Sequence, residues 1–173
     1  IYQLYSETGC KIKLYDTPVR EYGEDENIAK RTLREFSIED LLFRKPMSIN
    51  NRRSLNYYKD KVVLVTGGGG SIGSELCKQV AKCSPKKLII LDIYENNAHA
   101  ISLELKDRYP NLNLEVLIGS VRDSQRLDQL FRKYKPDVVY HAAAHKHVPL
   151  MEDSPCESIK NNAVGTYKTA YAA

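Results

Sequence analysis

The sequence predicts an α/β fold in which a parallel sheet carries helices on both faces. Apolar strand segments alternate with helical segments along residues 61–173. The strands are apolar almost throughout, which is typical of strands buried on both faces. The first strand runs directly into a glycine-rich turn that opens a helix, an arrangement that presents backbone N–H groups to a phosphate. Four strands are predicted, fewer than the six of a two-half dinucleotide fold, so we expect the sheet to be truncated after its fourth strand.

Each predicted element follows from local patterns. Short apolar runs predict the strands, and Pro110 follows the end of the second helix. Asp123 or Ser124 is expected to cap the third helix, and Pro155 lies in the first turn of the fourth, where proline is tolerated. Strands are therefore expected at 62–66, 88–92, 114–118 and 137–141, and helices at 72–82, 98–108, 124–133 and 155–173.

Residues 1–60 differ in pattern from the rest of the chain. A helix end is expected over 1–8 with Gly9 as its stop, and a short strand over 11–15. A capping-box pattern at 37–40 predicts a short helix that Pro46 ends. Because this region is too small to form its own core, we interpret 1–36 as the tail of a preceding domain, 37–60 as a linker, and 61–173 as the functional domain.

Composition limits the class of protein. The 173 residues carry a net charge of +4 without a dense basic stripe, which argues against nucleic-acid binding. No apolar run approaches the ~20 residues of a membrane span. The four cysteines form no C-x-x-C pair, which favours a reduced, cytoplasmic setting. The chain begins with Ile1, so a membrane anchor upstream of a domain that faces the cytoplasm stays an open expectation.

The glycine turn predicts a dinucleotide site of the Rossmann type. Its spacing is Gly67-x-x-Gly70-x-x-Gly73 between a strand and a helix. Gly67 is expected to permit the tight turn, Gly70 to let the backbone reach a pyrophosphate, and Gly73 to let the helix sit close to the strand. Ser71 and Ile72 would supply N–H groups of the helix start. The alternative is a plain strand–helix connector.

Asp92 ends the second predicted strand, where a ribose-binding carboxylate is expected. A carboxylate there would repel a ribose phosphate, and no basic residue directly follows it. We therefore expect NAD rather than NADP as the cofactor. The alternative is that Asp92 caps the following helix.

The segment after the fourth strand contains three histidines, His141, His145 and His147. Their spacing suggests a metal, but the small residues between them and the absence of nearby Cys or Asp argue against a closed site. We expect no metal here. Small residues at a strand end instead let a cofactor approach the backbone.

Tyr57 and Lys61 match the spacing of the catalytic pair of short-chain dehydrogenases. They precede the first strand of the sheet, whereas in that fold the pair follows the fifth. We interpret the match as incidental and expect no catalytic residue in this chain.

At these motifs the chain resembles extended short-chain dehydrogenases/reductases, and more narrowly the CapD-type polysaccharide-biosynthesis proteins, which are nucleotide-sugar 4,6-dehydratases. The segment His-Ala-Ala-Ala-His-Lys-His-Val-Pro at 141–149 is the most specific match. The other matching segments are 37–42, 65–76, 91–95, 118–123, 150–152 and 161–166.

The resemblance implies roles for further residues. Ser120 and Val121 would flank the adenine, although the family often has Asp at the position of Ser120. Lys146 would lie near the cofactor ribose or the sugar, and Asn162 in a cofactor-contact position. The nicotinamide side would be lined by residues 142–146, which include the small residues Ala142, Ala143 and Ala144.

The implied reaction removes water from a UDP-sugar, UDP-N-acetylglucosamine being the expected substrate. NAD oxidises the sugar at C-4, water leaves from C-5 and C-6, and the hydride returns. The resemblance places the acid and base beyond Ala173, so the fragment alone is expected to be inactive. Two alternatives stay open: a fragment of a nucleotide-sugar 4-epimerase, and a non-catalytic nucleotide-binding module.

Truncation of the sheet carries its own expectation. An apolar strand edge left unpaired favours association. We therefore expect either a homo-oligomer or a displaced C-terminal helix.

Overall fold

The computed structural model describes residues 13–15, 33–35 and 56–173. The chain divides into two units, Ile1–Ser48 and Ile49–Ala173, and the division falls inside the predicted linker. The helices expected over 1–8 and after the capping box at 37–40 lie outside the described residues, as do Gly9 and Pro46.

The described part of the first unit is a pair of short antiparallel strands. β1 (Lys13–Tyr15) pairs with β2 (Leu33–Glu35) so that Leu14 lies opposite Arg34. The predicted strand at 11–15 is confirmed over its last three residues. β2 was not predicted from the sequence.

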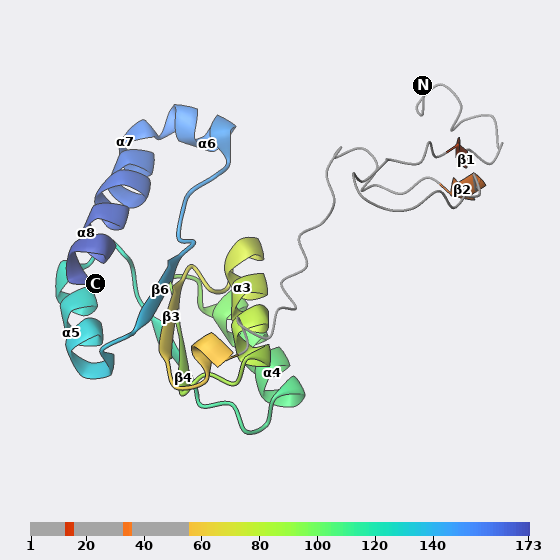
Figure 1. The fold of residues 1–173 in the computed structure, drawn as a ribbon. Coiled ribbons are helices and arrows are strands. Elements are labelled where there is room, and N and C mark those ends of the chain that lie inside the picture. Colours follow the sequence, from red (N-terminus) through yellow and green to blue (C-terminus); the bar gives the residue numbers. More distant parts are fainter. Residues whose placement is uncertain (1–12, 16–32, 36–55) are drawn as a thin grey trace, which may run out of the picture. The chain divides into compact units, whose positions relative to one another are not determined.

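The second unit contains a four-stranded parallel sheet with the strand order β5-β4-β3-β6 (Figure 1). The chain starts in the middle of this sheet, moves outward to β5, and then returns to β6 on the other side of β3. This order is the first part of a Rossmann sheet, so the predicted fold class is confirmed. The strands are β3 (Val62–Thr66), β4 (Lys87–Asp92), β5 (Leu114–Ile118) and β6 (Val138–His141).

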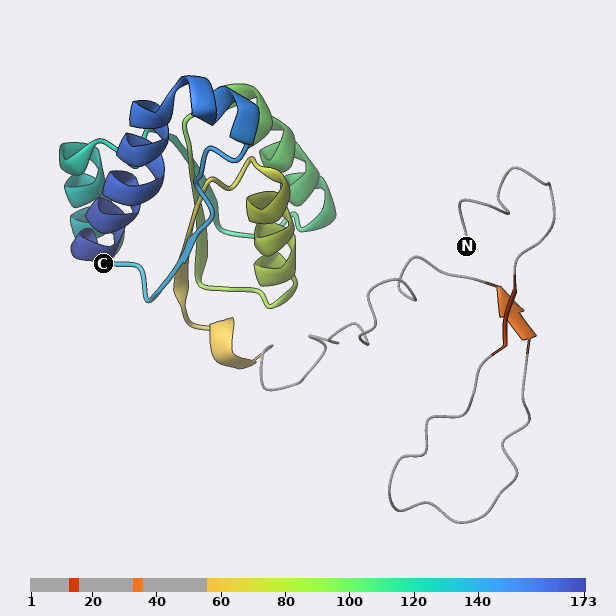
Figure 2. The same cartoon turned by 90° about the horizontal axis from the view of Figure 1, so that it is seen from above.

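Helices cover both faces of this sheet (Figures 1 and 2). α3 (Ser71–Lys82) and α4 (Glu95–Arg108) lie on one face. α5 (Ser124–Tyr134) lies on the other face, because the chain crosses over the sheet between β5 and β6. After β6 and the irregular residues 142–147, the chain forms further helices that are interrupted at Ser154. They are α6 (Val148–Asp153), α7 (Pro155–Ser158), the π-helix η2 (Ile159–Val164) and α8 (Gly165–Ala172).

The core consists of two apolar clusters, one on each face of the sheet. Val63, Val65 and Ile90 point toward α3 and α4 and pack with Cys77 and Leu105. Leu64, Ile89 and Leu91 point the other way and pack with the apolar side of α5, which comprises Leu127, Leu130 and Phe131. The alternation along β3 and β4 therefore buries both faces of the sheet.

The C-terminal helix is docked on this core rather than displaced from it. Ala172 packs against the cluster beneath α5, and the Thr169 side chain is buried. The structure thus does not show the displaced helix that the sequence suggested. Among the described strands β6 pairs only with β3, so its other edge is free, and self-association through it stays a prediction.

Candidate functional site

A cavity opens where the carboxyl ends of the four parallel strands meet. In α/β sheets of this order, ligands bind at this edge of the sheet. They bind next to β3, where the chain reverses the direction in which it adds strands. The cavity is lined by Gly67, Gly70, Leu91, Asp92, Ile93, Asn97, Gly119, Ser120, Val121, Ala142, Ala143, Ala144, His145 and Asn161.

The glycine turn forms one wall, and most of its glycines, Gly67 and Gly73 among them, leave no room for a side chain. Gly67 has φ +67°, and a Cβ there would lie 2.7 Å from the carbonyl carbon of Ala142. A Cβ on Gly73 would lie 2.0 Å from the carbonyl oxygen of Gly67. The turn is closed by the Gly70 N–H, which donates to the Gly67 carbonyl at 3.1 Å. Gly67 thus has a backbone conformation that favours glycine, and Gly73 brings the start of the helix against the turn itself. The roles of both residues toward a cofactor stay predictions.

The amino end of α3 faces this turn and carries no cap of its own. Its N-cap residue is Gly70, no side chain bonds to the first helical N–H groups, and its first turn has no acidic residue. Gly70, Ser71 and Ile72 are exposed. Because the first N–H groups of a helix have no intrahelical partner and carry partial positive charge, this end fits a pyrophosphate.

The Asp92 carboxylate lies between the glycine turn and α4. One oxygen accepts the Gly69 N–H at 2.8 Å and the other accepts the Tyr94 N–H at 2.9 Å. Each oxygen keeps a lone pair for a hydroxyl donor. The N-cap residue of α4 is Tyr94 rather than Asp92, so the helix-cap alternative does not account for this side chain. The arrangement fits a ribose diol.

The loop after β5 forms the opposite wall. The Ser120 hydroxyl accepts the Arg122 N–H at 3.1 Å, and the Asp123 N–H donates to the Ser120 carbonyl. Val121 is buried, and a Cβ on Gly165 of α8 would lie 2.9 Å from its Cγ2. The loop is thus held both by its own turn and by the last helix.

Asn162 holds the loop after β6 rather than the cavity itself. Its side-chain oxygen accepts the His145 N–H at 2.8 Å and its side-chain nitrogen donates to the His145 carbonyl at 2.8 Å. Asn161 donates to the same oxygen of Asn162 and is the residue of η2 that lines the cavity. Asn162 therefore supports the wall indirectly, through His145.

His141, the last residue of β6, connects three elements. Its Nδ1 is 2.7 Å from Thr66 Oγ1 at the end of β3, and its Nε2 is 2.9 Å from Thr166 Oγ1 of α8. Burial lowers the pKa of this imidazole. Two hydroxyl partners suit the neutral ring, which has one donor and one acceptor.

The predicted site residues divide into those that line the cavity and those that do not. Eight line it: Gly67, Gly70, Asp92, Ser120, Val121, Ala142, Ala143 and Ala144. Ser71 and Lys146 lie instead in a neighbouring shallow hollow between α3 and α4, which also contains Ser74, Lys78 and His147. Ile72, Gly73 and Asn162 line neither.

Sequence reasoning missed five residues of the cavity, while His145 lies within the range 142–146 expected to line it. Leu91, Ile93 and Gly119 are neighbours in sequence of predicted residues, so position at a strand end was the available signal. Asn97 enters from the first turn of α4 and Asn161 from η2. Their arrival depends on how the helices pack, which no local pattern reports.

The spacing of the three histidines and that of Tyr57 and Lys61 were two further features of the sequence. Of the histidines, His145 lines the cavity. Among the described residues no cluster of three or more His, Cys, Asp or Glu side chains could hold a metal ion. Lys61 lies just before the amino end of β3, whereas the glycine turn follows its carboxyl end. The Lys61 Nζ is 3.6 Å from Asp137 Oδ1. This placement agrees with the interpretation of the Tyr57/Lys61 spacing as incidental.

None of the helices in the described ranges is long and apolar enough to cross a membrane.

The family model described as "Polysaccharide biosynthesis protein" matches residues 63–173. The probable polysaccharide biosynthesis protein EpsC of Bacillus subtilis is 44% identical, with 98% of this chain covering 29% of that protein. The capsular polysaccharide biosynthesis protein CapD of Staphylococcus aureus is 40% identical, with 94% of this chain covering 27% of it. A UDP-N-acetylglucosamine 4,6-dehydratase (inverting) of Campylobacter jejuni is 37% identical, and the match covers 62% of this chain and 31% of that protein.

Solved structures with the same fold include Pen from Bacillus thuringiensis, which is 34% identical with a TM-score of 0.62. The match covers 68% of this chain and 35% of the Pen chain. A UDP-glucose 4-epimerase from Stenotrophomonas maltophila, with bound NAD and formylated UDP-arabinopyranose, is 26% identical with a TM-score of 0.59; the match covers 65% of this chain and 33% of that one. The chain thus spans about a third or less of the length of the proteins it resembles.

Proposed function

Because this chain belongs to the polysaccharide biosynthesis protein family, whose model matches residues 63–173, we propose that it forms the NAD-binding part of a nucleotide-sugar 4,6-dehydratase. The curated relatives of this family include polysaccharide biosynthesis proteins and a UDP-N-acetylglucosamine 4,6-dehydratase. The proposal concerns cofactor, substrate and reaction, and each rests on a different observation.

The observation that carries the proposal is the convergence of three features on one cavity. The uncapped amino end of α3, which reaches the cavity through Gly70, has free N–H groups for a pyrophosphate. The buried Asp92 carboxylate has lone pairs for the two ribose hydroxyls. Between them, Gly67 and Ala142 are in such close contact that the wall is almost bare backbone, which suits the close approach of a flat dinucleotide.

We propose NAD as the cofactor because of the charge at Asp92. A 2′-phosphate would stand beside a carboxylate in a largely desolvated site, and like charges so placed are costly. NAD is bound in solved structures of three neighbouring proteins, two UDP-glucose 4-epimerases and the Bordetella bronchiseptica enzyme WbmG, which supports the same assignment.

The substrate we propose is a UDP-sugar, with UDP-N-acetylglucosamine as the first candidate. The dehydratase relative that acts on this sugar is 37% identical over 109 residues, and neighbouring structures hold UDP or UDP-glucose. NAD, when bound, would accept a hydride from the sugar and return it. The role of this chain's own residues is to bind and orient the cofactor and to exclude water from the cavity around it.

A 4-epimerase is the second candidate, because several structural neighbours are UDP-glucose 4-epimerases. The two activities share the oxidation of the sugar and differ in whether water is lost. The cofactor site does not distinguish them, since both need the same pocket.

The experiment mixes the protein with NAD and UDP-N-acetylglucosamine and follows the sugar nucleotide by mass spectrometry and NMR. For a protein that contains the complete catalytic domain, a product 18 mass units lighter, as expected for loss of one water, supports the dehydratase. A C-4 epimer of unchanged mass supports the alternative. If the protein with the complete catalytic domain binds NAD tightly but forms neither product, the result would support a non-catalytic module and contradict both enzymes.

A further inference from the structure

Two segments of the cavity wall, a loop and a π-helix, are far apart in the sequence. Ser120 and Val121 belong to the loop after β5, and Asn161 belongs to η2. The separation between these two segments affects the shape of the cavity, which Asp92 also lines. A contact that fixes this separation would therefore act on cofactor affinity without touching the cofactor.

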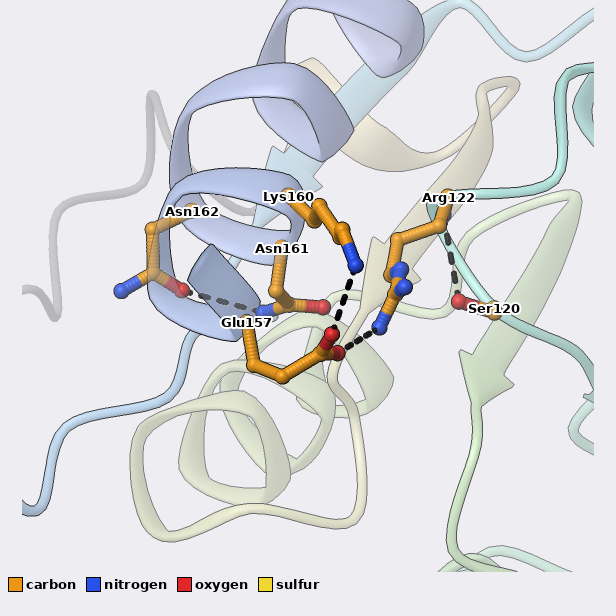
Figure 3. Close-up of polar contacts among 6 residues, drawn as sticks. All are labelled: Ser120, Arg122, Glu157, Lys160, Asn161 and Asn162. Carbon is orange, nitrogen blue, oxygen red and sulfur yellow. Dashed lines mark hydrogen bonds and ion pairs between the residues drawn. The ribbon is translucent and has the colours of Figure 1, made fainter. Parts of the chain in front are cut away.

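Arg122 joins these segments through its side chain. Its guanidinium Nη1 lies 2.5 Å from Glu157 Oε2 on α7 (Figure 3). The other oxygen of Glu157 is 2.9 Å from Lys160 Nζ, one turn further along the same helical segment. Figure 3 shows both cations converging on this one carboxylate, with Asn161 beside it. Lys160 and Arg122 together hold the pKa of Glu157 below its usual value.

The main chain of Arg122 is held by the same helical segment. Lys168 Nζ donates to the Arg122 carbonyl at 2.6 Å, and the neighbouring Val121 packs against Gly165. Three contacts thus tie one loop to the helical segment 155–172, whereas the Arg122 N–H turns back to Ser120. The loop cannot shift without disturbing one of them.

From this arrangement we propose that Arg122 and Glu157 are positioning residues that set the cavity for the adenosine half of the cofactor. The proposal rests on the proposed function, because it takes the cavity to be the NAD site. It adds two residues to which neither the motifs nor the family resemblance gave a role. Neither side chain lines the cavity, so their effect is exerted through Ser120, Val121 and Asn161.

The test is a double-mutant cycle with R122Q, E157Q and the double variant, read as the Kd for NAD and for 5′-AMP. Because the pair is partly exposed to solvent, each single substitution is expected to weaken both ligands about two- to fivefold. The double variant should bind no more weakly than the weaker single, because the two side chains act as one unit. Nicotinamide mononucleotide should bind all four proteins equally.

A second pair on α5 provides the control. Arg132 Nε and Asp128 Oδ1 are 2.8 Å apart and well exposed, and neither residue lines the cavity. R132Q and D128N should leave all three affinities unchanged, and every variant should keep a melting temperature close to that of the original chain.

Hydrogen exchange separates this proposal from the proposed function. E157Q should speed exchange at the amides of Ser120 and Asn161 more than D128N does, with or without cofactor. If the original chain binds no NAD, the proposed function fails. If it binds NAD and the variants match it in affinity and exchange, or if the singles are additive, the positioning role is wrong.

Discussion

The Asp92 carboxylate accepts a hydrogen bond from the Gly69 N–H at 2.8 Å, so the residue that ends β4 holds the turn that follows β3. Asp92 therefore stabilises the glycine turn, in addition to its expected role of accepting hydrogen bonds from ribose hydroxyls. It also brings a negative charge close to the buried Cys77. Burial, with a smaller contribution from Asp92, raises the pKa of that thiol to about 12, so Cys77 stays protonated and inert.

The glycine turn gives a prediction that separates stability from binding. G73A should lower the free energy of unfolding by about 3 kcal/mol, because its Cβ would lie 2.0 Å from the Gly67 carbonyl oxygen. Denaturant unfolding measures this change. Unaltered stability of G73A would mean that the close contact between turn and helix is not maintained in solution.

G70A is the matched variant in the same turn. Its Cβ would meet only the Gly67 oxygen, at 3.3 Å, so stability should change by less than about 1 kcal/mol. The added methyl group would stand where the pyrophosphate approaches, and the NAD Kd should rise about tenfold. Equal NAD affinity of G70A and the original chain would contradict the assignment of this helix end to the pyrophosphate.

His141 predicts a pH dependence of stability. Burial lowers its pKa in the folded state, so the unfolded chain binds the proton more readily. The contribution of His141 is therefore complete above the unfolded pKa of about 6.5 and is lost as the pH falls below it. The free energy of unfolding should decrease between pH 7 and pH 5.5.

H141Q should flatten this dependence, since its amide does not titrate. H99Q is the control, because His99 is exposed on α4. An H141Q slope equal to that of the original chain would show that the His141 contacts with Thr66 and Thr166 do not control the titration.

The 173-residue chain is expected not to convert UDP-N-acetylglucosamine. The one Tyr/Lys pair at the dehydrogenase spacing begins at Tyr57, and its Lys61 lies at the end of β3 away from the cavity. Incubation with NAD and the sugar nucleotide should give no 4-keto product by mass spectrometry. Product formation that Y57F abolishes would overturn the interpretation of this pair as incidental.

Strands were the elements that sequence reasoning predicted best. The bounds of β3 and β5 match the expected 62–66 and 114–118, because short apolar runs between polar turns leave little freedom. Asp123 caps α5 through the Arg126 N–H, as its position before the helix suggested.

The errors arose where tertiary packing overrides local preference. α4 begins at Glu95, three residues before the expected start, since Asn96 and Asn97 are weak helix formers that the fold nevertheless places in the first turn. α6 was not predicted, although Pro149 lies in its first turn, where proline is tolerated. β2 pairs with a strand far along the chain, without the short turn that marks a hairpin.

The site followed the same division. The residues that line the cavity from strand ends and turns could be predicted, because they belong to short motifs of consecutive residues. The part that Asn162 and Arg122 play depends on contacts across 17 and 35 residues. Such contacts are fixed only when η2 and α7 have packed.

Titration calorimetry of the 173-residue chain with NAD and with NADP tests the central claim most directly. With Asp92 facing the adenosine ribose, NAD should bind more tightly by about 1–3 kcal/mol, and D92N should reduce this difference. The matched control is E95Q. Glu95 is an exposed acidic residue at the start of α4, and its substitution should leave the difference in affinity between NAD and NADP unchanged. Equal or tighter binding of NADP by the original chain would contradict the assignment of Asp92 and, with it, the proposed NAD site.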